Sequence, residues 1–330
     1  MTIRRLRSAI RRRGLVAAGL AAAALAGCVT RQPMTDDYDG PESLPTTLAE
    51  AFRFEYEPKA PKTDALRDRR DFTVHEVILP AVKDGSGRIE LGEIRLEYYD
   101  VAGSDVTPVI VVLPIANGNM LVSRYFGKYF ADRGWATVIV DRLDDPLASV
   151  LNDPESIIKR NIFDYKRILD WVERQPELGE IGVFGISFGG MAAVMLAALD
   201  DRIDAVVAAM AGGDLPHLMV NTSYRAVARQ INQALRESGT SRERLAERLA
   251  EMIDSDPLRF APYVDAGEIL LVVTRTDMIV PFESQEKLRR ALGEPETLYL
   301  PTGHRTSVFY FPFLRNSARA FFERQFSARN

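Results

Sequence analysis

The stretch Gly182-Val183-Phe184-Gly185-Ile186-Ser187-Phe188-Gly189-Gly190-Met191 decides how the rest of the chain is interpreted. An apolar run leads into Gly-x-Ser-x-Gly, and small residues follow as far as Ala198. This order predicts a buried strand, a sharp turn with Ser187 at its apex, and a helix. The turn forces the serine backbone toward left-handed geometry, so side chains at Gly185 or Gly189 would clash. The Ser187 hydroxyl would then stand at a helix N-terminus, where a developing negative charge is favoured.

Length and composition are those of a folded globular domain. The chain has 330 residues, 46% of them hydrophobic, and a formal net charge of -4. These values exclude a disordered chain, and we expect no nucleic-acid partner. With one cysteine and three histidines, the chain has neither a disulfide framework nor a thiolate metal site. We see no other metal-ligand pattern and no phosphate-binding glycine loop, so we expect no metal and no cofactor.

The first residues have the pattern of an export signal. Six arginines lie within Arg4 to Arg13, before an apolar run (14–24) that is too short for a membrane-spanning helix. The run ends in Leu25-Ala26-Gly27-Cys28, which resembles the lipobox of bacterial lipoproteins. The resemblance implies that residues 1–27 are removed and that a lipid on Cys28 attaches the protein to a membrane. The alternative is an ordinary signal peptide with an incidental cysteine.

Residues 28–70 follow this signal and predict a flexible tether. They are polar and interrupted by prolines, with one short packed helix expected near Leu48–Phe54. The residue after Cys28 is Val29, and an aspartate there would indicate retention in the inner membrane. We therefore expect the periplasmic face of the outer membrane. The general secretory and twin-arginine routes of export both stay open.

Beyond the tether the chain alternates between strand and helix patterns. Continuous apolar runs such as Pro108–Leu113 and Glu268–Thr274 predict central parallel strands buried on both faces. Two alternating segments, Phe72–Leu79 and Glu93–Tyr99, predict an antiparallel edge pair. The sequence thus predicts an α/β fold over residues 71–330, with a mostly parallel sheet covered by helices on both faces.

One segment, about 214–266, interrupts this alternation. It contains two apolar stripes at helical spacing, one from Tyr224 to Leu235 and one from Leu245 to Met252. Thr240 and Glu243 have the spacing of a capping box for the second helix. We expect a helical cap that roofs a substrate pocket, the alternative being ordinary covering helices.

The strand order and three motifs resemble the α/β-hydrolase superfamily over roughly residues 72–330. The motifs are Gly-Ile-Ser-Phe-Gly-Gly around Ser187, the turn Thr274-Arg275-Thr276-Asp277, and Thr302-Gly303-His304. Within the superfamily the chain looks most like the dienelactone-hydrolase and prolyl-oligopeptidase-like esterase branch. The resemblance implies the α/β-hydrolase fold, with a nucleophile, an acid and a histidine in that chain order.

A serine needs a base beside it, because a neutral hydroxyl is a poor nucleophile. Of the three histidines, His304 follows the last predicted strand, at the sheet edge where sites in α/β folds gather. We predict it as the catalytic base. His75 lies on an expected edge strand, so we predict a surface or structural residue there. His217 lies in the inserted segment and could line the pocket.

The acid that orients the base is predicted to be Asp277, which ends a hydrophobic strand. Its alternative role is a helix cap before Pro281. Asp214, just after the preceding strand, is the runner-up for the acid. Asp141 also ends a strand but precedes the serine, which makes it the poorer candidate.

Two backbone N–H groups should stabilise the oxyanion of the reaction. Phe188, directly after the nucleophile, supplies the first by the geometry of the turn. The second is expected from the turn after Leu113. Pro114 has no N–H to give, which leaves Ile115 or Ala116.

Together these residues predict a serine hydrolase that acts on an ester or a similar small acyl compound through an acyl-enzyme intermediate. A serine peptidase of prolyl-oligopeptidase-like type is the second interpretation. A non-catalytic envelope lipoprotein that uses the fold as a binding scaffold is the third, because a fold by itself does not prove activity.

Overall fold

The structure is a computed structural model that describes residues 29–85, 89–101, 103, 106–116, 118–141 and 147–329. The predicted signal peptide and Cys28 lie outside the described residues. Within them, no helix combines the length and the apolar character needed to cross a membrane.

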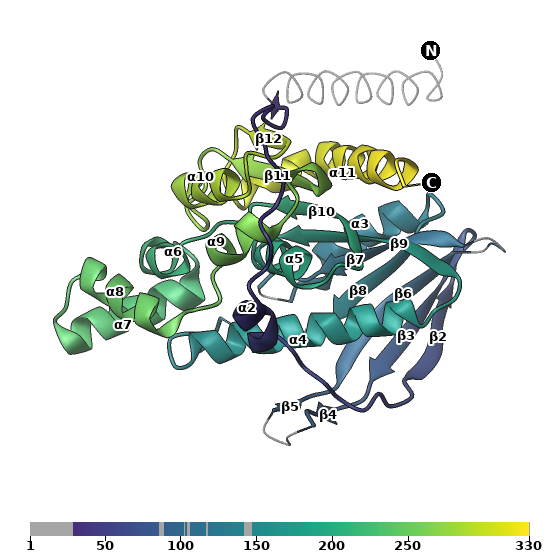
Figure 1. The fold of residues 1–330 in the computed structure, drawn as a ribbon, viewed down its shortest axis with the longest axis horizontal. Coiled ribbons are helices and arrows are strands. Elements are labelled where there is room, and N and C mark those ends of the chain that lie inside the picture. The colour runs from purple at the N-terminus through teal and green to yellow at the C-terminus, as the bar shows by residue number, and fades with distance from the viewer. Residues whose placement is uncertain are drawn as a thin grey trace, which may run out of the picture.

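A single twisted sheet forms the centre of the described chain (Figure 1). Its order is β1-β12-β11-β10-β9-β7-β8-β6-β3-β2. From β12 to β8 the neighbouring strands run parallel, and both margins are antiparallel. The strands are β1 (Thr30–Gln32), β2 (Lys62–Asp68), β3 (Phe72–Leu79), β6 (Ile94–Val101), β7 (Thr107–Leu113), β8 (Ala136–Asp141), β9 (Leu178–Ile186), β10 (Ile203–Ala209), β11 (Ile269–Thr274) and β12 (Thr297–Leu300); β4 (Val82–Lys83) and β5 (Glu90–Leu91) form a separate pair.

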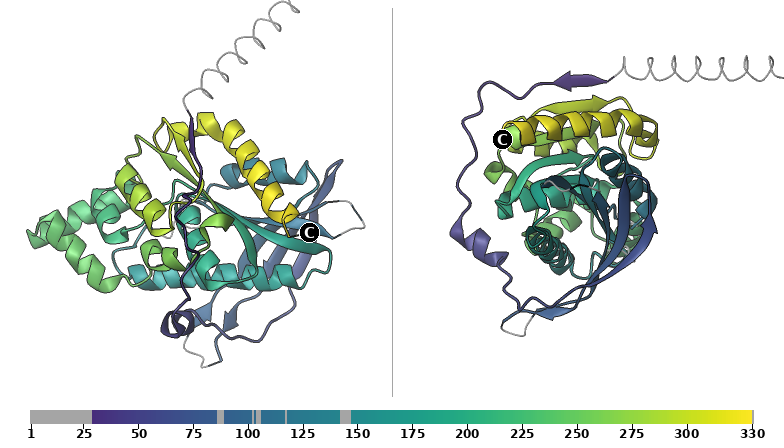
Figure 2. Two further views of the ribbon diagram at one scale, coloured as in Figure 1. Left: turned by 45° about the horizontal axis from the view of Figure 1, so that its top comes forward. Right: turned by 90° about the vertical axis from the view of Figure 1, so that its right-hand side faces the viewer.

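Helices cover both faces of this sheet (Figure 2). On one face lie α2 (Thr46–Ala51), α4 (Pro154–Glu173), α5 (Phe188–Leu199) and α10 (Phe282–Ala291), which share one apolar cluster. On the other face α3 (Met120–Ala131) and α11 (Phe311–Ser327) bury aromatic side chains, among them Phe126, Phe130 and Phe322. Because both faces are covered, the central strands are apolar on both sides, as their continuous hydrophobic runs predicted. The predicted fold class is confirmed.

The segment predicted as a flexible tether differs from that prediction. Strand β2 pairs antiparallel with β3, β1 pairs with β12, and α2 buries Leu48 while Phe52 is buried beside it. The packed helix near Leu48–Phe54 is therefore present, and the sheet begins before residue 71. Every side chain of β2 is exposed, so this strand is defined by its backbone pairing with β3 and not by burial. Its sequence lacks the alternation by which a half-buried strand is detected.

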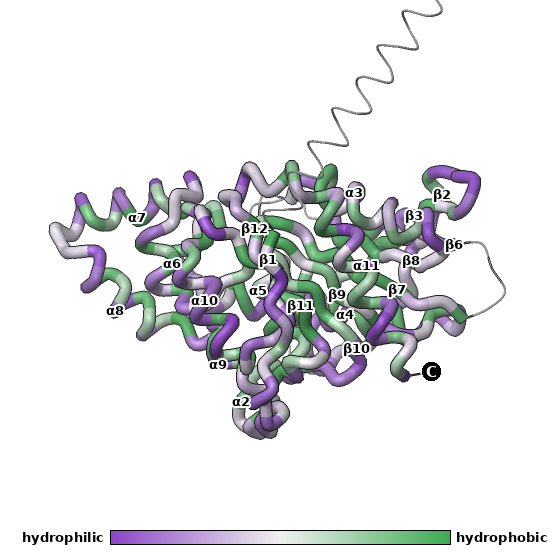
Figure 3. Tube along the Cα trace, turned by 90° about the horizontal axis from the view of Figure 1, so that it is seen from above, coloured by the Kyte–Doolittle hydropathy of each residue, from purple (hydrophilic) through white to green (hydrophobic). Residues whose placement is uncertain are grey.

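The inserted segment contains α6 (Leu215–Asn221), α7 (Arg225–Ser238), α8 (Arg242–Met252) and the short α9 (Pro257–Phe260). Helices α7 and α8 project from the body of the molecule and carry mixed polar and apolar residues (Figure 3). The two helices predicted from the apolar stripes are thus present. The N-cap of α8 is Ser241, whose side chain accepts a hydrogen bond from the Arg244 N–H, and not Thr240.

Candidate active site

The turn between β9 and α5 places Ser187 at a strained backbone position. Its φ of 57° lies in the left-handed region and it is the N-cap residue of α5. A Cβ at Gly185 would lie 2.2 Å from the carbonyl oxygen of Gly189, so no side chain fits there. The Ser187 N–H donates to the carbonyl of Ala209 at 2.8 Å. The turn is therefore fixed by the close approach of Gly185 to Gly189 and by a bond to β10, in the geometry that Gly-x-Ser-x-Gly predicts.

His304 and Asp277 come together from two different loops at the carboxyl edge of the sheet. The His304 Nδ1 lies 2.7 Å from Asp277 Oδ2. Burial acts to raise the pKa of the Asp277 carboxyl, but the hydrogen bond and charge interaction with His304, followed by the hydrogen bond from Thr274, outweigh it and hold that pKa below its ordinary value. An ionised carboxylate at this place holds the imidazole proton on Nδ1, so that Nε2 carries no proton and can act as a base.

Further donors hold the Asp277 carboxylate. Its Oδ1 accepts from the N–H groups of Ile279 and Val280 at 2.8 and 2.9 Å. Its Oδ2 also accepts from the Thr274 hydroxyl at 2.7 Å. These bonds use both oxygens of the carboxylate, and its side chain is completely buried. The acid can therefore take one orientation only.

A second residue, Gln285, braces the same turn and was not predicted from the sequence. Its amide nitrogen donates to the Val280 carbonyl at 2.7 Å, and its amide oxygen accepts from the Thr274 N–H at 3.0 Å. The side chain is fully buried. A lone glutamine in a helix normally indicates a surface position, so a polar residue on the inward face of α10 was the only signal that could have revealed it.

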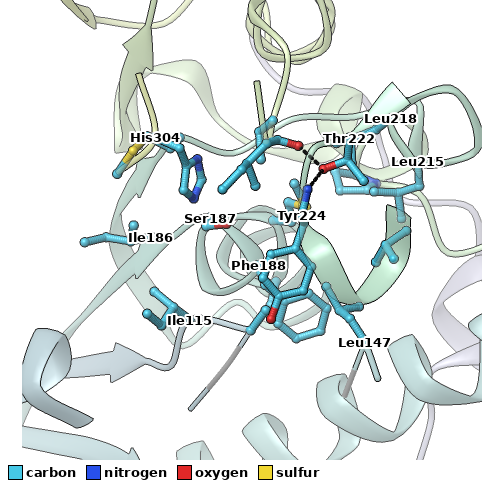
Figure 4. A pocket seen from close by; sticks show the side chains of 18 of the residues that line it. Ile115, Leu147, Ile186, Ser187, Phe188, Leu215, Leu218, Thr222, Tyr224 and His304 are labelled. Atoms are coloured by element: carbon cyan, nitrogen blue, oxygen red, sulfur yellow. Dashed lines mark hydrogen bonds between the residues drawn. The ribbon is translucent and has the colours of Figure 1, made fainter. Parts of the chain in front are cut away.

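Ser187 and His304 line one cavity, in which the His304 ring points toward Ser187 (Figure 4). No hydrogen bond joins the two side chains among the described residues. Such bonds are often long before substrate binds and tighten in the complex. The structure thus brings together the predicted base and acid through a direct bond, and the predicted nucleophile through the shared cavity.

The predicted oxyanion donors also meet at this cavity. A Cβ at Gly189 would lie 2.9 Å from the carbonyl oxygens of Leu113 and Pro114, so the turn after β7 touches the first residues of α5. Ile115, Ala116 and Phe188 all line the cavity. The three predicted donor residues therefore line the same cavity as Ser187.

The alternative residues lie elsewhere. The runner-up acid Asp214 accepts a hydrogen bond from Lys287 Nζ at 2.7 Å and does not pair with His304. His217 is exposed on α6 and does not line the cavity. His75 lies on β3, where its Nε2 is 3.7 Å from Asp100. Asp141 ends β8, where it is in register with Arg95 of β6.

The cavity has a volume of about 410 Å³ and a mostly apolar wall. Part of the inserted segment contributes to it, as the predicted roof requires: Leu215, Leu218, Met219, Tyr224 and Val227 line it. Among the described lining residues, none comes from α8 and Pro257 of α9 is the one from the second half of the segment, so residues 215–227 form most of this wall.

Thr222 ties this wall to the acid turn. Its hydroxyl donates to the carbonyl of Ile279 at 2.6 Å and accepts from the Tyr224 N–H at 3.0 Å (Figure 4). The next residue, Ser223, donates its N–H to the carbonyl of Met278 at 2.7 Å. The chain between α6 and α7 is therefore anchored to the loop that carries Asp277.

Comparison with known proteins agrees with this architecture. A family model described as X-Pro dipeptidyl-peptidase (S15 family) matches residues 56–262. Two uncharacterized proteins from strains of Mycobacterium tuberculosis are 26% identical over 160 residues, which cover 48% of this chain and 36% of theirs. The chain thus spans about a third of the length of these curated relatives.

Two solved esterases share the fold. An acetyl xylan esterase from Paenibacillus sp. R4 is 18% identical, with a TM-score of 0.59 over 83% of this chain and 91% of that one. Acetyl xylan esterase 1 from Thermoanaerobacterium sp. JW/SL YS485 is 16% identical, with a TM-score of 0.61 over 83% and 94%. The α/β-hydrolase superfamily predicted from the sequence is confirmed, and the particular esterase branch stays a prediction.

Proposed function

Because the chain belongs to the X-Pro dipeptidyl-peptidase (S15) family of hydrolases, we propose that it is a serine hydrolase that cleaves an ester through an acyl-enzyme intermediate. The observation that carries the proposal is the 2.7 Å contact of Asp277 with His304 Nδ1, at a cavity that Ser187 also lines. A nucleophile, a base and an acid that holds the base are the parts this chemistry needs.

In the proposed reaction the Ser187 Oγ attacks the carbonyl carbon of the ester while His304 Nε2 takes its proton. The carbonyl oxygen becomes an oxyanion, and the N–H of Phe188 with that of Ile115 or Ala116 stabilises it. His304 then gives the proton to the leaving alcohol oxygen as the C–O bond breaks. Water repeats the sequence on the acyl-enzyme and releases the acid, while Asp277 remains ionised throughout.

A dipeptidyl-peptidase activity is the second candidate, because the matching family model is named for it. An enzyme that releases dipeptides must bind the positively charged N-terminus of its substrate, and a carboxylate is the usual partner for a buried ammonium. Among the described residues that line the cavity, none is an aspartate or a glutamate. This lining supports an ester over a peptide with a free N-terminus.

Covalent labelling with a fluorophosphonate tests the proposal, because the probe reacts with a serine that a base has activated. We expect the purified protein to be labelled and to hydrolyse p-nitrophenyl acetate, and Ser187→Ala to lose both activities. His217→Ala is the matched control for His304→Ala, and only the latter should slow labelling. A glycyl-prolyl-p-nitroanilide assay compares the second candidate directly. A wild-type protein that resists the probe and cleaves neither substrate would leave the binding scaffold as the remaining interpretation.

We further propose that Cys28 carries a lipid that anchors the protein at the periplasmic face of the outer membrane. The lipobox-like sequence supports this proposal. Each buried lipid methylene contributes about 0.8 kcal/mol, so several acyl chains give a stable attachment that a single chain does not. Cys28→Ser should release the protein from membranes or block its processing. A wild-type protein recovered only in the soluble fraction, with an N-terminus other than residue 28, would exclude the anchor.

A further inference from the structure

We propose that the cavity binds the acyl chain of a medium-chain aliphatic ester, and that the alcohol part stays at the mouth beside His304. The inference rests on the proposed function and names the substrate class for the same site. It comes from three features of the cavity: its course along α5, its apolar wall, and the side on which it opens.

The cavity follows one face of α5 away from the nucleophile. The lining residues on this helix are Phe188, Met191, Ala192 and Met195. Their spacing of three, four and seven residues places them on a single stripe. From Ser187 to Met195 the helix rises about 12 Å, at 1.5 Å for each residue. A substrate held at Ser187 therefore has a channel beside it for two turns of the helix.

The wall of this channel is apolar. Ile158 and Ile162 of α4 face it from one side, and Leu215 and Met219 of α6 from another. Among the described lining residues, the ones with a chargeable nitrogen are His304 and Arg305, which are neighbours in the chain. A wall of this kind recognises hydrocarbon, because apolar surface gains free energy when it leaves water.

The side chain of Asn161, a polar residue of the wall, donates to the carbonyl of Ile157 at 2.6 Å. The Thr222 hydroxyl donates to Ile279 as described above. Each of these polar side chains already has a partner within the protein, with which a polar substrate would have to compete. These residues are compatible with a hydrocarbon ligand.

The position of His304 decides which half of the ester enters the channel. His304 must pass its proton to the leaving oxygen, so the alcohol part lies on the His304 side. Arg305 and Val308, which follow in the chain, line the cavity and are exposed, so this side opens to solvent. The acyl part points the other way, along α5 toward α4.

The length of the channel sets the expected chain length. A fully extended chain advances about 1.2 Å for each bond, so about 12 Å corresponds to roughly ten bonds. We therefore expect acyl chains of about eight to ten carbons to fill it. Each methylene that enters the channel should raise kcat/KM about fourfold, the factor that corresponds to about 0.8 kcal/mol.

The first test is a series of p-nitrophenyl esters from acetate to myristate, which changes the acyl chain and keeps the leaving group. We expect kcat/KM to rise to about eight to ten carbons and then to level off or fall. A matched series of alkyl acetates, from ethyl to octyl, should change much less. A flat acyl series, or a steeper alcohol series, in a protein whose Ser187 reacts with the fluorophosphonate would overturn this inference and leave the proposed function standing.

The second test blocks the channel. Ala192→Leu adds bulk halfway along it and should lower the ratio of octanoate to acetate hydrolysis at least tenfold. Ala250→Leu makes the same change at an exposed position of α8 and should leave the ratio unchanged. If Ala192→Leu does not fold, Met195→Ala decides, since opening the far end should move the preferred chain to longer acyl groups. An unchanged preference in a folded variant contradicts the proposal.

Discussion

The acid turn (residues 274–285) and the first cap helices, α6 and α7, both border the cavity, but they are held in different ways. In the acid turn, side chains and backbone groups are joined by hydrogen bonds that leave Gln285 and the Asp277 carboxylate wholly enclosed. In the cap, α7 buries only Val227 and Ile231. The base of the cap is held by apolar contacts and by the hydrogen bonds of Thr222 and Ser223 to the acid turn.

This difference separates two tasks. A buried polar group that loses its partner costs about 1–3 kcal/mol, so any other geometry of the acid turn would be destabilised by its unpaired groups. Apolar walls accept changes of shape at a cost below about 1.5 kcal/mol when volume is kept. We infer that the acid turn secures the chemistry and the cap secures the choice of substrate. Substitutions in the acid turn should therefore lower kcat strongly, whereas substitutions in the cap should have smaller effects and should change the preference among substrates.

The largest effect on kcat is expected for substitutions of the nucleophile and of the histidine that the acid turn holds. Ser187→Ala and His304→Ala should each lower kcat by about 10⁴- to 10⁶-fold, because each removes the same proton-transfer step. The double variant should be no slower than either single one. Ester hydrolysis in single-turnover assays measures this, with His217→Ala as the matched control. Losses that multiply in the double variant would show that the two side chains act independently.

The next effect distinguishes the two aspartates that compete for the role of the acid. Asp277→Asn should lower kcat by about 10³- to 10⁴-fold, because an amide favours the wrong imidazole tautomer. Asp214→Asn removes only an ion pair with Lys287 and should change kcat less than about tenfold. Steady-state kinetics and circular dichroism on both variants give the comparison. Equal losses in kcat would assign Asp214 a catalytic part.

These residues also show how far the sequence alone reaches. The contact of Asp277 with His304 at the cavity that Ser187 lines could be predicted because the fold imposes a chain order and because each residue follows a recognisable strand. The central strands could be predicted because burial on both faces leaves an apolar run. In both cases the signal lies within a few consecutive residues.

The rest depended on contacts between distant segments. Gln285 accepts a hydrogen bond from the N–H of Thr274, eleven positions earlier, and no local sequence pattern predicts that partner. Strand β2 is defined by pairing with β3 and carries no buried side chain. The share of the cap that lines the cavity depends on how α6 and α7 are oriented in the folded chain, and periodicity predicts a helix without its orientation.

A smaller effect compares two glutamines, one in each region. Gln285→Leu leaves the N–H of Thr274 and the carbonyl of Val280 without partners, and should lower the free energy of unfolding by about 1–3 kcal/mol. It should also lower kcat about tenfold with little change in KM, because it loosens the turn that holds Asp277. Gln230→Leu removes bonds to Leu147 and Leu151 at a partly buried site of α7. Its stability cost should be below about 1 kcal/mol, with kcat unchanged.

Urea unfolding and steady-state kinetics measure both glutamine variants. Gln285→Glu is a useful addition, since it keeps the acceptor for Thr274 but loses the donor to Val280. If Gln230→Leu costs as much stability and as much kcat as Gln285→Leu, the two regions are held alike and the contrast drawn between them is wrong.

The smallest effect is a difference in pH dependence between two aspartates, Asp277 in the acid turn and Asp256, the N-cap residue of α9, at the base of the cap. The Asp277 pKa is lowered, whereas burial raises the pKa of Asp256, although it accepts hydrogen bonds from the N–H groups of Leu215 and Leu258 at the base of the cap. For Asp277 the unfolded chain binds the proton more readily than the folded protein does. Its stabilising contribution is therefore present above about pH 3.9, the ordinary value, and is lost as the pH falls through the lower folded pKa.

For Asp256 the sign is reversed, because the folded protein binds the proton more readily than the unfolded chain. Ionisation of Asp256 then opposes folding above its raised folded pKa, and that cost disappears as the pH falls toward about 3.9. The stability difference between wild type and Asp277→Asn should shrink in acid. For Asp256→Asn the change is opposite: as the pH falls, the free energy of unfolding of the wild type should increase relative to that of the variant. Urea unfolding of the three proteins between pH 3 and pH 7 measures both slopes. Slopes of the same sign would show that the two carboxylates experience similar surroundings, and that the polar enclosure of the acid turn does not distinguish it from the cap.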